Sequence, residues 1–283
     1  MTAAAGRAKS TGARLRFAAP HLLGRFFGRK KAKNPLAFVF YSTSERYAAA
    51  ALVFVHLLRG LGIRGDADVL LLHFPLPPAM LDRARKMGII TRPVAAFRGG
   101  PRNHYRHCYV KLRALGLIEY ERILFADADA IPLKSLDPLL SIEMKNPLAA
   151  PLAYWLPQPY WTSAMFLAQP SRALWQRVRP HIASTGRTAL YDMDILNKEF
   201  AGEIDTLPRD TFSLNSEWEH QDKPGWFGNP QQALKQVSVV HFSALGKPWF
   251  YSTAEAKIRR QQAHPEFFEL WDRWQRAHDA IFR

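Results

Sequence analysis

The chain has 283 residues, enough for one large domain or two small ones, and its 48% hydrophobic and 12% aromatic content is typical of a globular protein. Its net charge of +15, from 39 Lys and Arg against 24 Asp and Glu, favours an anionic partner. The single Cys108 excludes an internal disulfide and a structural metal site built on several thiolates. The sequence has no signal-peptide core and no apolar run near the roughly 20 residues of a membrane span, so we expect a cytoplasmic protein.

The composition of residues 1–34 predicts a basic, flexible tail. Nine of them are Lys or Arg and none is acidic, which leaves 30 basic against 24 acidic residues in the rest of the chain. Apolar residues such as Phe26 and Phe27 are interleaved with these charges. Three interpretations stay open: a solubilising tail, a segment that lies on an anionic membrane surface, or an organelle transit peptide.

From residue 36 to residue 127 the sequence alternates predicted strands and helices. The predicted strands are residues 37–41, 68–74, 88–94 and 122–127, and the predicted helices are residues 47–60, 78–87 and 105–115. This is the strand-helix-strand pattern of a parallel sheet, so we expect an α/β fold.

The second half of the chain is more mixed. It predicts strands at residues 161–167 and 237–242, helices at residues 171–178 and 191–200, and a C-terminal amphipathic helix over residues 255–283. The aromatic side of that helix, which includes Trp271 and Trp274, either packs on the core or faces a membrane. We therefore divide the chain into the tail, one α/β domain over residues 35–254, and the C-terminal helix.

The predicted strand at residues 122–127 leads directly into two acidic residues, Asp127 and Asp129. Because side chains repeat every second residue along a strand, both carboxylates face the same way. Carboxylates this close repel each other unless a cation neutralises them, and open α/β folds bind ligands at the carboxyl ends of their strands. A site for a divalent cation and a diphosphate is the first hypothesis, with the alternative that both residues merely form a turn before Pro132.

A second apolar strand ends on His241, and Lys247 follows six residues later. An imidazole and two carboxylates suit Mn²⁺, and an ammonium group pairs well with phosphate oxygens. The alternative for His241 alone is a structural imidazole that hydrogen-bonds at the end of the sheet.

At these positions and several others, the sequence resembles the family 8 glycosyltransferases, the group that contains glycogenin and the bacterial lipooligosaccharide galactosyltransferases. The likeness runs from about residue 37 to residue 251 and keeps one order along the chain: residues 37–47, 51–53, 111–112, 120–137, 192–197, 207–215, 241–242 and 247–249. It implies a GT-A fold, which is a Rossmann-like, mostly parallel sheet flanked by helices. It also implies a UDP-sugar donor, Mn²⁺, and transfer of a hexose-type sugar to a hydroxyl acceptor with retention of configuration. The acceptor, whether glycan, lipid or protein, stays open.

The resemblance also implies roles for individual residues. The metal ligands would be Asp127, Asp129 and His241. The predicted donor contacts are Ser42, Tyr47, Arg102, Lys111, Ala128 and Lys247. The predicted catalytic residues are Asp192 and Asp194, which face the donor sugar, and Lys247, which stabilises the leaving diphosphate. For Tyr47, stacking on the uracil base competes with a role in packing its own helix.

Three positions depart from the family pattern. The family usually has Asn-Ser-Gly where this chain has residues 162–164 (Thr-Ser-Ala), Gly where Ala244 stands, and Gln where Met193 stands. The extra methyl group of Ala244 lies in the predicted phosphate loop. Because a thioether has no carbonyl oxygen to attack a sugar, Met193 predicts front-face transfer without a covalent sugar adduct.

Two other classes of protein compete with this interpretation. One is a phosphohydrolase of the haloacid dehalogenase type with Asp127 as nucleophile, although residues 130–132 fit that pattern poorly. The other is a non-enzymatic basic protein that binds nucleic acid or a membrane surface, for which the charge is the only support and which predicts salt-dependent binding. We expect no nucleic-acid partner.

Overall fold

The structure is a computed structural model that describes residues 32–95, 104–183, 190–221 and 226–283. Most of the predicted tail and Arg102 therefore lie outside the described residues. Within them, no helix is both long enough and apolar enough to cross a membrane.

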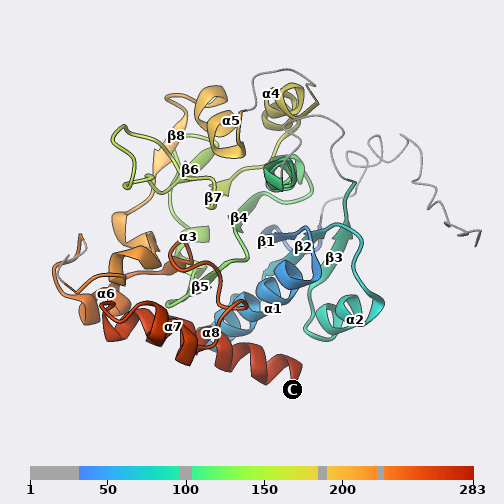
Figure 1. The fold of residues 1–283 in the computed structure, drawn as a ribbon. Helices are drawn as coiled ribbons and strands as arrows, with labels where there is room; N and C mark the ends of the chain where they lie inside the picture. The colour runs from blue at the N-terminus through green and yellow to red at the C-terminus, as the bar shows by residue number, and fades with distance from the viewer. Residues whose placement is uncertain (1–31, 96–103, 184–189, 222–225) are drawn as a thin grey trace, which may run out of the picture.

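A seven-stranded sheet forms the centre of the molecule (Figure 1). Its strand order is β3 (Ile90–Pro93), β2 (Ala67–His73), β1 (Leu36–Ser42), β4 (Arg122–Ala126), β7 (Met165–Ala168), β6 (Leu148–Ala150) and β8 (Ile204–Thr206). The first four strands are parallel, β7 is antiparallel to both of its neighbours, and β6 is parallel to β8. The prediction of a mostly parallel α/β sheet is confirmed.

A second sheet of three short strands lies at the end of β4. Its order is β5 (Ala130–Pro132), β10 (Val239–His241) and β9 (Phe212–Leu214). Antiparallel pairing of β10 with β5 sets His241 opposite Ala130, the residue that follows Asp129. The segment that carries the two aspartates therefore runs directly from the large sheet into the small one.

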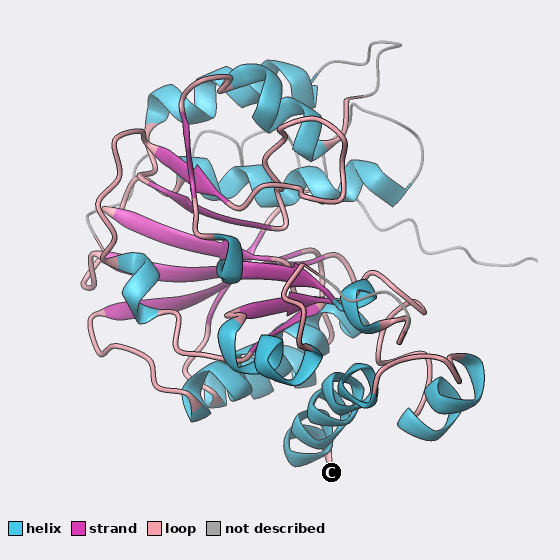
Figure 2. Ribbon diagram, turned by 90° about the vertical axis from the view of Figure 1, so that its left-hand side faces the viewer, coloured by secondary structure: helices cyan, strands magenta, loops and turns pink. Residues whose placement is uncertain are grey.

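Helices cover both faces of the large sheet, as Figure 2 shows from the side. The α-helices are α1 (Glu45–Gly60), α2 (Pro78–Lys86), α3 (Asp137–Leu140), α4 (Arg172–Ala183), α5 (Asp192–Glu199), α6 (Pro230–Gln236), α7 (Thr253–Arg259) and α8 (Pro265–Phe282). Three 3₁₀ helices complete the described elements: η3 (His104–Gly116), η4 (Arg209–Thr211) and η5 (Asn215–Trp218).

The alternation of apolar residues along β1 explains the two layers. Phe38 and Phe40 belong to the core formed with α1, α2, α7 and α8, whereas Val39 and Tyr41 belong to the core formed with η3, α4 and α5. A strand buried on both faces needs an uninterrupted apolar run, as residues 37–41 provide.

The sequence predicted a single C-terminal helix over residues 255–283, and this prediction is wrong. The structure has two helices, α7 and α8, with a break before Pro265. Proline has no N–H to donate and disfavours a helical conformation at the residue before it, and His264 is accordingly extended with ψ of 149°. Trp271 and Trp274 are buried, so the aromatic side of this segment packs on the core rather than facing outward.

Candidate active site

The two aspartates lie where the chain leaves β4. The backbone N–H of Asp127 still donates to the carbonyl of Ala164 beside β7 (2.8 Å), while the carbonyl of Asp129 accepts from Phe242 beside β10 (3.0 Å). These bonds hold the intervening Ala128 between the two sheets. Asp127 and Asp129 are 8% and 7% exposed, so both carboxylates are almost removed from solvent.

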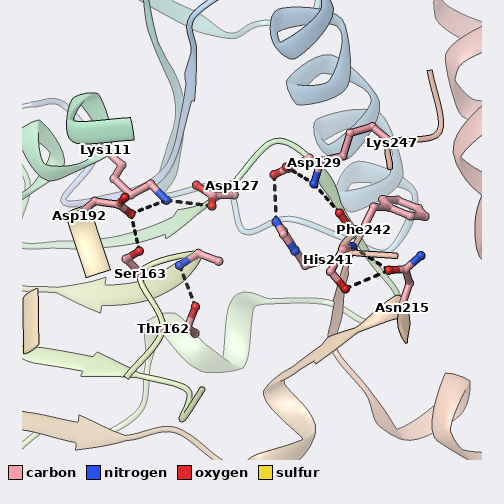
Figure 3. A network of polar contacts seen from close by, with 12 residues as sticks. Lys111, Asp127, Asp129, Thr162, Ser163, Asp192, Asn215, His241, Phe242 and Lys247 are labelled. Carbon is pink, nitrogen blue, oxygen red and sulfur yellow. Dashed lines mark hydrogen bonds and ion pairs between the residues drawn. The ribbon is translucent and has the colours of Figure 1, made fainter. Parts of the chain in front are cut away.

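Asp129 is flanked by two basic side chains from the region after β9 (Figure 3). Its Oδ1 lies 3.2 Å from Nε2 of His241, and its Oδ2 lies 2.7 Å from Nζ of Lys247. Burial would raise the pKa of Asp129, but these two partners hold it below its ordinary range. The structure thus brings the predicted His241 and Lys247 to the carboxylate that the sequence assigns to a metal.

The donor set fits a divalent cation. One ligand atom each from Asp127, Asp129 and His241 lies within 4.8 Å of the others. Oδ1 of Asp127 and Nδ1 of His241 are buried and have no hydrogen-bond partner in the described part of the chain. Buried polar atoms are normally hydrogen-bonded, so two such atoms in one cluster are consistent with a cation that completes it. Two carboxylates and an imidazole are a suitable set for Mn²⁺.

A buried lysine connects Asp127 to the acidic helix α5. Nζ of Lys111 lies 2.9 Å from Oδ2 of Asp127 and 3.0 Å from Oδ2 of Asp192, and Ser163 donates to that same Asp192 oxygen at 2.5 Å (Figure 3). Burial would lower the pKa of Lys111, but the two carboxylates raise it above its ordinary value, so the ammonium stays charged. Asp192 is therefore fixed in place.

The pKa values of the two carboxylates that flank Lys111 shift in opposite directions. Burial raises the pKa of Asp127, and the lysine only partly offsets this. Burial also acts on Asp192, but Lys111 and the Ser163 hydroxyl hold its pKa below the ordinary value. Asp192 is thus an ionised hydrogen-bond acceptor close to the two-aspartate cluster.

Asp194 has different surroundings from Asp192. Its Oδ1 accepts from the hydroxyl of Tyr160 at 2.7 Å, and its Oδ2 accepts from the backbone N–H of Tyr191 at 2.9 Å. Both contacts stabilise the first turn of α5. In the described part of the chain, neither of these two partners of Asp194 is shared with Asp192, Lys111 or the two aspartates.

Two of the predicted nucleotide contacts lie at the end of β1. Ser42 is fully buried, and its hydroxyl has no hydrogen-bond partner in the described part of the chain. Tyr47, at the start of α1, is half-buried and contacts Trp249 edge-on, with 5.2 Å between ring centroids. Burial raises the pKa of Tyr47, and the negative charges of Asp129 and Asp127 add to the effect.

Asn215, which had no predicted role, holds the loop that carries Lys247. Oδ1 of Asn215, at the end of β9, accepts from the backbone N–H groups of Ser243 and Ala244 at 2.7 and 2.8 Å. Leu245 and Gly246 both have positive φ, and the chain turns there toward Lys247. The lysine ammonium also donates to the carbonyl of Phe242.

Helix α8 holds the far side of the same loop. Nε2 of Gln275 donates to the carbonyls of Pro248 and Tyr251 at 3.3 and 2.7 Å, and Nε1 of Trp271 donates to Tyr251 at 2.9 Å. The C-terminal helix is thereby coupled to the position of the predicted phosphate contact. No motif marks Gln275, since a polar residue on an amphipathic helix usually faces solvent.

The large sheet thus carries paired aspartates, an imidazole and a lysine at the end of β4. The family described as Glycosyl transferase family 8 matches residues 82–253, and the chain belongs to this family. Because the chain belongs to a glycosyltransferase family, the alternative interpretation as a phosphohydrolase with Asp127 as nucleophile does not hold.

Curated relatives include two fungal proteins named glucose N-acetyltransferase 1. That of Gibberella zeae is 27% identical over 256 residues, covering 81% of this chain and 56% of the relative; that of Aspergillus fumigatus is 28% identical over 253 residues, covering 76% and 65%. Mouse (Mus musculus) glycogenin-1 is 30% identical over 175 residues, covering 57% of this chain and 49% of the relative. The chain thus spans about half to two thirds of the length of these relatives.

A solved structure of the galactosyltransferase LgtC, in complex with donor and acceptor sugar analogues, has the same fold. It superposes with a TM-score of 0.63 at 18% identity, over 87% of this chain and 96% of LgtC. A second LgtC structure, of an active-site mutant, gives a TM-score of 0.65 at the same identity and coverage. The GT-A fold predicted from the sequence is confirmed.

Proposed function

We propose that this protein is a metal-dependent hexosyltransferase that moves a sugar from a UDP-sugar donor to a hydroxyl acceptor with retention of configuration. The observation that carries the proposal is the convergence of Asp127, Asp129 and His241 within 4.8 Å at the end of β4, with Lys247 2.7 Å from Asp129. Family membership and the similarity to LgtC support it. We place the reaction in the cytoplasm and include no nucleic acid among the partners. A role of residues 1–34 on an anionic membrane stays a prediction from the sequence.

Asp127, Asp129 and His241 would hold Mn²⁺. When bound, the cation neutralises the diphosphate and stabilises the charge that develops on the leaving UDP. Lys247 adds a second positive charge on the same side. In the structure its ammonium pairs with Asp129, so contact with a phosphate requires it to leave that carboxylate for the donor. Two cationic groups would then face the leaving oxygen, where preorganised charge contributes most to catalysis.

The uridine would bind at the end of β1. The unpartnered hydroxyl of Ser42 is available to a polar group of the nucleoside, and Tyr47 offers a ring to the base. Trp249 supports this ring edge-on and belongs to the loop after Lys247, so base binding and phosphate binding depend on one segment. Ala128 and Arg102 stay predictions from the family pattern, and Arg102 lies outside the described residues.

The donor sugar would lie against Asp192. Lys111 and Ser163 hold its carboxylate ionised and oriented, so it can accept hydrogen bonds from sugar hydroxyls that strengthen as positive charge develops on the ring. Asp194 would act indirectly, by fixing the first turn of α5 through Tyr160. Lys111 would act by holding Asp192 ionised and in place beside Asp127.

Replacing Gln275 by Leu should weaken donor binding although Gln275 does not line the site. The change removes the donor to the buried Pro248 carbonyl and one of the two donors to the Tyr251 carbonyl. Leaving a buried group unsatisfied costs on the order of 1–3 kcal/mol, so the loop that carries Lys247 should shift, and we expect the KM for the UDP-sugar to rise by about tenfold. Steady-state kinetics check this. Arg276→Ala is the matched control, since Arg276 is exposed and pairs only with acidic residues of its own helix. An unchanged KM in Gln275→Leu would show that α8 does not position the loop.

A panel of UDP-sugars tests the proposed function without knowledge of the acceptor. The protein is incubated with UDP-glucose, UDP-galactose, UDP-N-acetylglucosamine or UDP-xylose and Mn²⁺, and free UDP is measured. We expect slow release from at least one donor, lost when a chelator is added. Release from none of them, or equal release in chelator, would contradict the proposal.

A further inference from the structure

The loops after β6 and β8 emerge at the same edge of the sheet as the metal cluster. β7 begins beside the end of β4, with Met165 opposite Ala126, and its antiparallel partner β6 therefore ends at this edge. β8 runs parallel to β6, so Thr206 lies beside Ala150 and the segment leading to Arg209 leaves from there too. Any large molecule that reaches the cluster from this side meets residues 151–161 and 207–211.

The first of these loops carries large apolar side chains that are not buried. Leu152, Trp155 and Leu156 are 36–39% exposed, and Trp226, from the segment after η5, is 38% exposed. Exposed indole rings at the edge of a site are unusual, because burial is their normal state and each exposed ring leaves a large apolar face in water.

An arginine lies against Trp226 and against Tyr154, the neighbour of Trp155. The guanidinium of Arg209 lies 3.5 Å from the ring centroid of Tyr154 and 4.1 Å from that of Trp226. Its Nη1 donates to the carbonyl of Phe212 at 3.1 Å, and the hydroxyl of Tyr154 accepts from the N–H of Leu214 at 2.9 Å. The arrangement is thus anchored to β9, the neighbour of the strand that carries His241.

Two ring contacts connect this surface to the metal cluster. The ring centroid of Trp155 lies 6.3 Å from that of Phe212, and Phe212 lies 6.0 Å from the ring of His241. Phe212 itself is buried, so it forms the floor between the exposed indole and the predicted metal ligand. A single buried ring therefore separates Trp155 from His241.

We propose that Trp155 and Trp226, with Arg209, form the platform on which the acceptor sugar binds, an inference that rests on the proposed function. The apolar face of a pyranose ring covers an indole well, and its hydroxyls need donors at the rim. Nη2 of Arg209 is buried and has no hydrogen-bond partner in the described ranges, so a donor is present beside the rings. The ligand class is a neutral or acidic oligosaccharide whose terminal hydroxyl reaches past Phe212 toward Asp192.

A lipid surface is the competing occupant for exposed Trp and Leu side chains. The observations favour a sugar for two reasons. Tyr154 and Trp226 flank the guanidinium of Arg209, whose Nη2 has no hydrogen-bond partner in the described ranges, and the loops that carry these residues lie at the same edge of the sheet as the metal cluster. A lipid-binding patch would need neither feature.

Trp155→Ala tests the platform, with Trp155→Phe as the conservative variant. The probe is an array of immobilised oligosaccharides, read with the full chain in Mn²⁺ and UDP; anionic vesicles of phosphatidylserine and phosphatidylcholine are tested in parallel. We expect Trp155→Ala to weaken retention on the bound glycans by about tenfold, as for loss of one aromatic anchor, and Trp155→Phe to keep most of it. Circular dichroism checks that both variants are folded.

The matched control is Ile90→Ala, an equally exposed apolar residue at the amino end of β3, the opposite edge of the sheet. It should leave glycan retention unchanged. Absence of glycan binding by the wild-type chain, equal binding by Trp155→Ala, or Trp155-dependent recruitment to vesicles alone would overturn the inference. Glycan retention that depends on Trp155, without UDP release from any donor, would support the platform and contradict the proposed function, so the two failures are distinguishable.

Discussion

Replacing Asp129 or His241 by Ala should abolish Mn²⁺-dependent turnover of the UDP-sugar donor. Each substitution removes one of three ligand atoms that converge within 4.8 Å, and Asp129 is also the partner of Lys247. Loss of one well-placed electrostatic contact costs on the order of 10²–10³ in rate, and loss of the cation removes more than one such contact. The measurement is UDP release at saturating Mn²⁺.

The control for this prediction is a carboxylate remote from the cluster. Asp205, on β8, accepts hydrogen bonds from Lys145 and Asn146, so Asp205→Ala removes a bonded carboxylate without touching the cation site. It should lower stability and leave the rate per folded molecule unchanged. Circular dichroism establishes that the Asp129 and His241 variants are folded. Full activity in either of them would show that the cation site is wrongly assigned.

Asp192→Ala should lose most activity, by on the order of 10²-fold, whereas the neighbouring Met193→Ala should keep appreciable turnover. Asp192 is buried, ionised and held by Lys111 and Ser163, so it is preorganised to contact the sugar. Met193 is half-buried on the same helix and has no carbonyl oxygen to attack the anomeric carbon. The steady-state kcat of the two variants with the same donor checks this.

The same pair of variants bears on how configuration is retained. We expect front-face transfer, in which the acceptor hydroxyl attacks from the side that UDP leaves and its proton passes to a departing phosphate oxygen. Asp192→Asn, which keeps the size of the side chain but not its charge, should be nearly as inactive as Asp192→Ala. Mass spectrometry of protein trapped with a slow donor analogue should find no sugar adduct. An adduct on Asp192 or Asp194 would contradict front-face transfer, and a product of inverted configuration would contradict retention.

The residues at the centre of the site could be predicted because strand geometry is local. The apolar runs before Asp127 and before His241 predicted the two strands and the ends at which these side chains lie. The direction of the carboxylates was not predicted correctly: β4 ends at Ala126, so Asp127 and Asp129 lie in the bend beyond it, where Asp127 meets Lys111 and Asp129 meets His241 and Lys247. That these two segments pair through β5 and β10 depends on tertiary structure, yet the charges already required a neutralising partner.

The supporting residues could not be predicted because their roles depend on contacts between segments distant in sequence. Gln275 lies 27 residues from Pro248, and Asn215 lies 28 residues from Ser243. Asp192 and Asp194 read as equivalent in the sequence, but on a helix residues two apart do not share a face, and only Asp192 meets Lys111. The break before Pro265 had a local signal, the proline itself, which the amphipathic pattern obscured.

Binding of Mn²⁺ in the presence of UDP tests the central claim most directly, because it needs neither the correct donor sugar nor an acceptor. Free Mn²⁺ is measured by electron paramagnetic resonance as wild-type protein or Asp129→Ala is added, with and without UDP. The account predicts that wild-type protein with UDP removes one Mn²⁺ per chain from solution and that Asp129→Ala does not. Equal uptake by the two proteins, or none by the wild type, would contradict it.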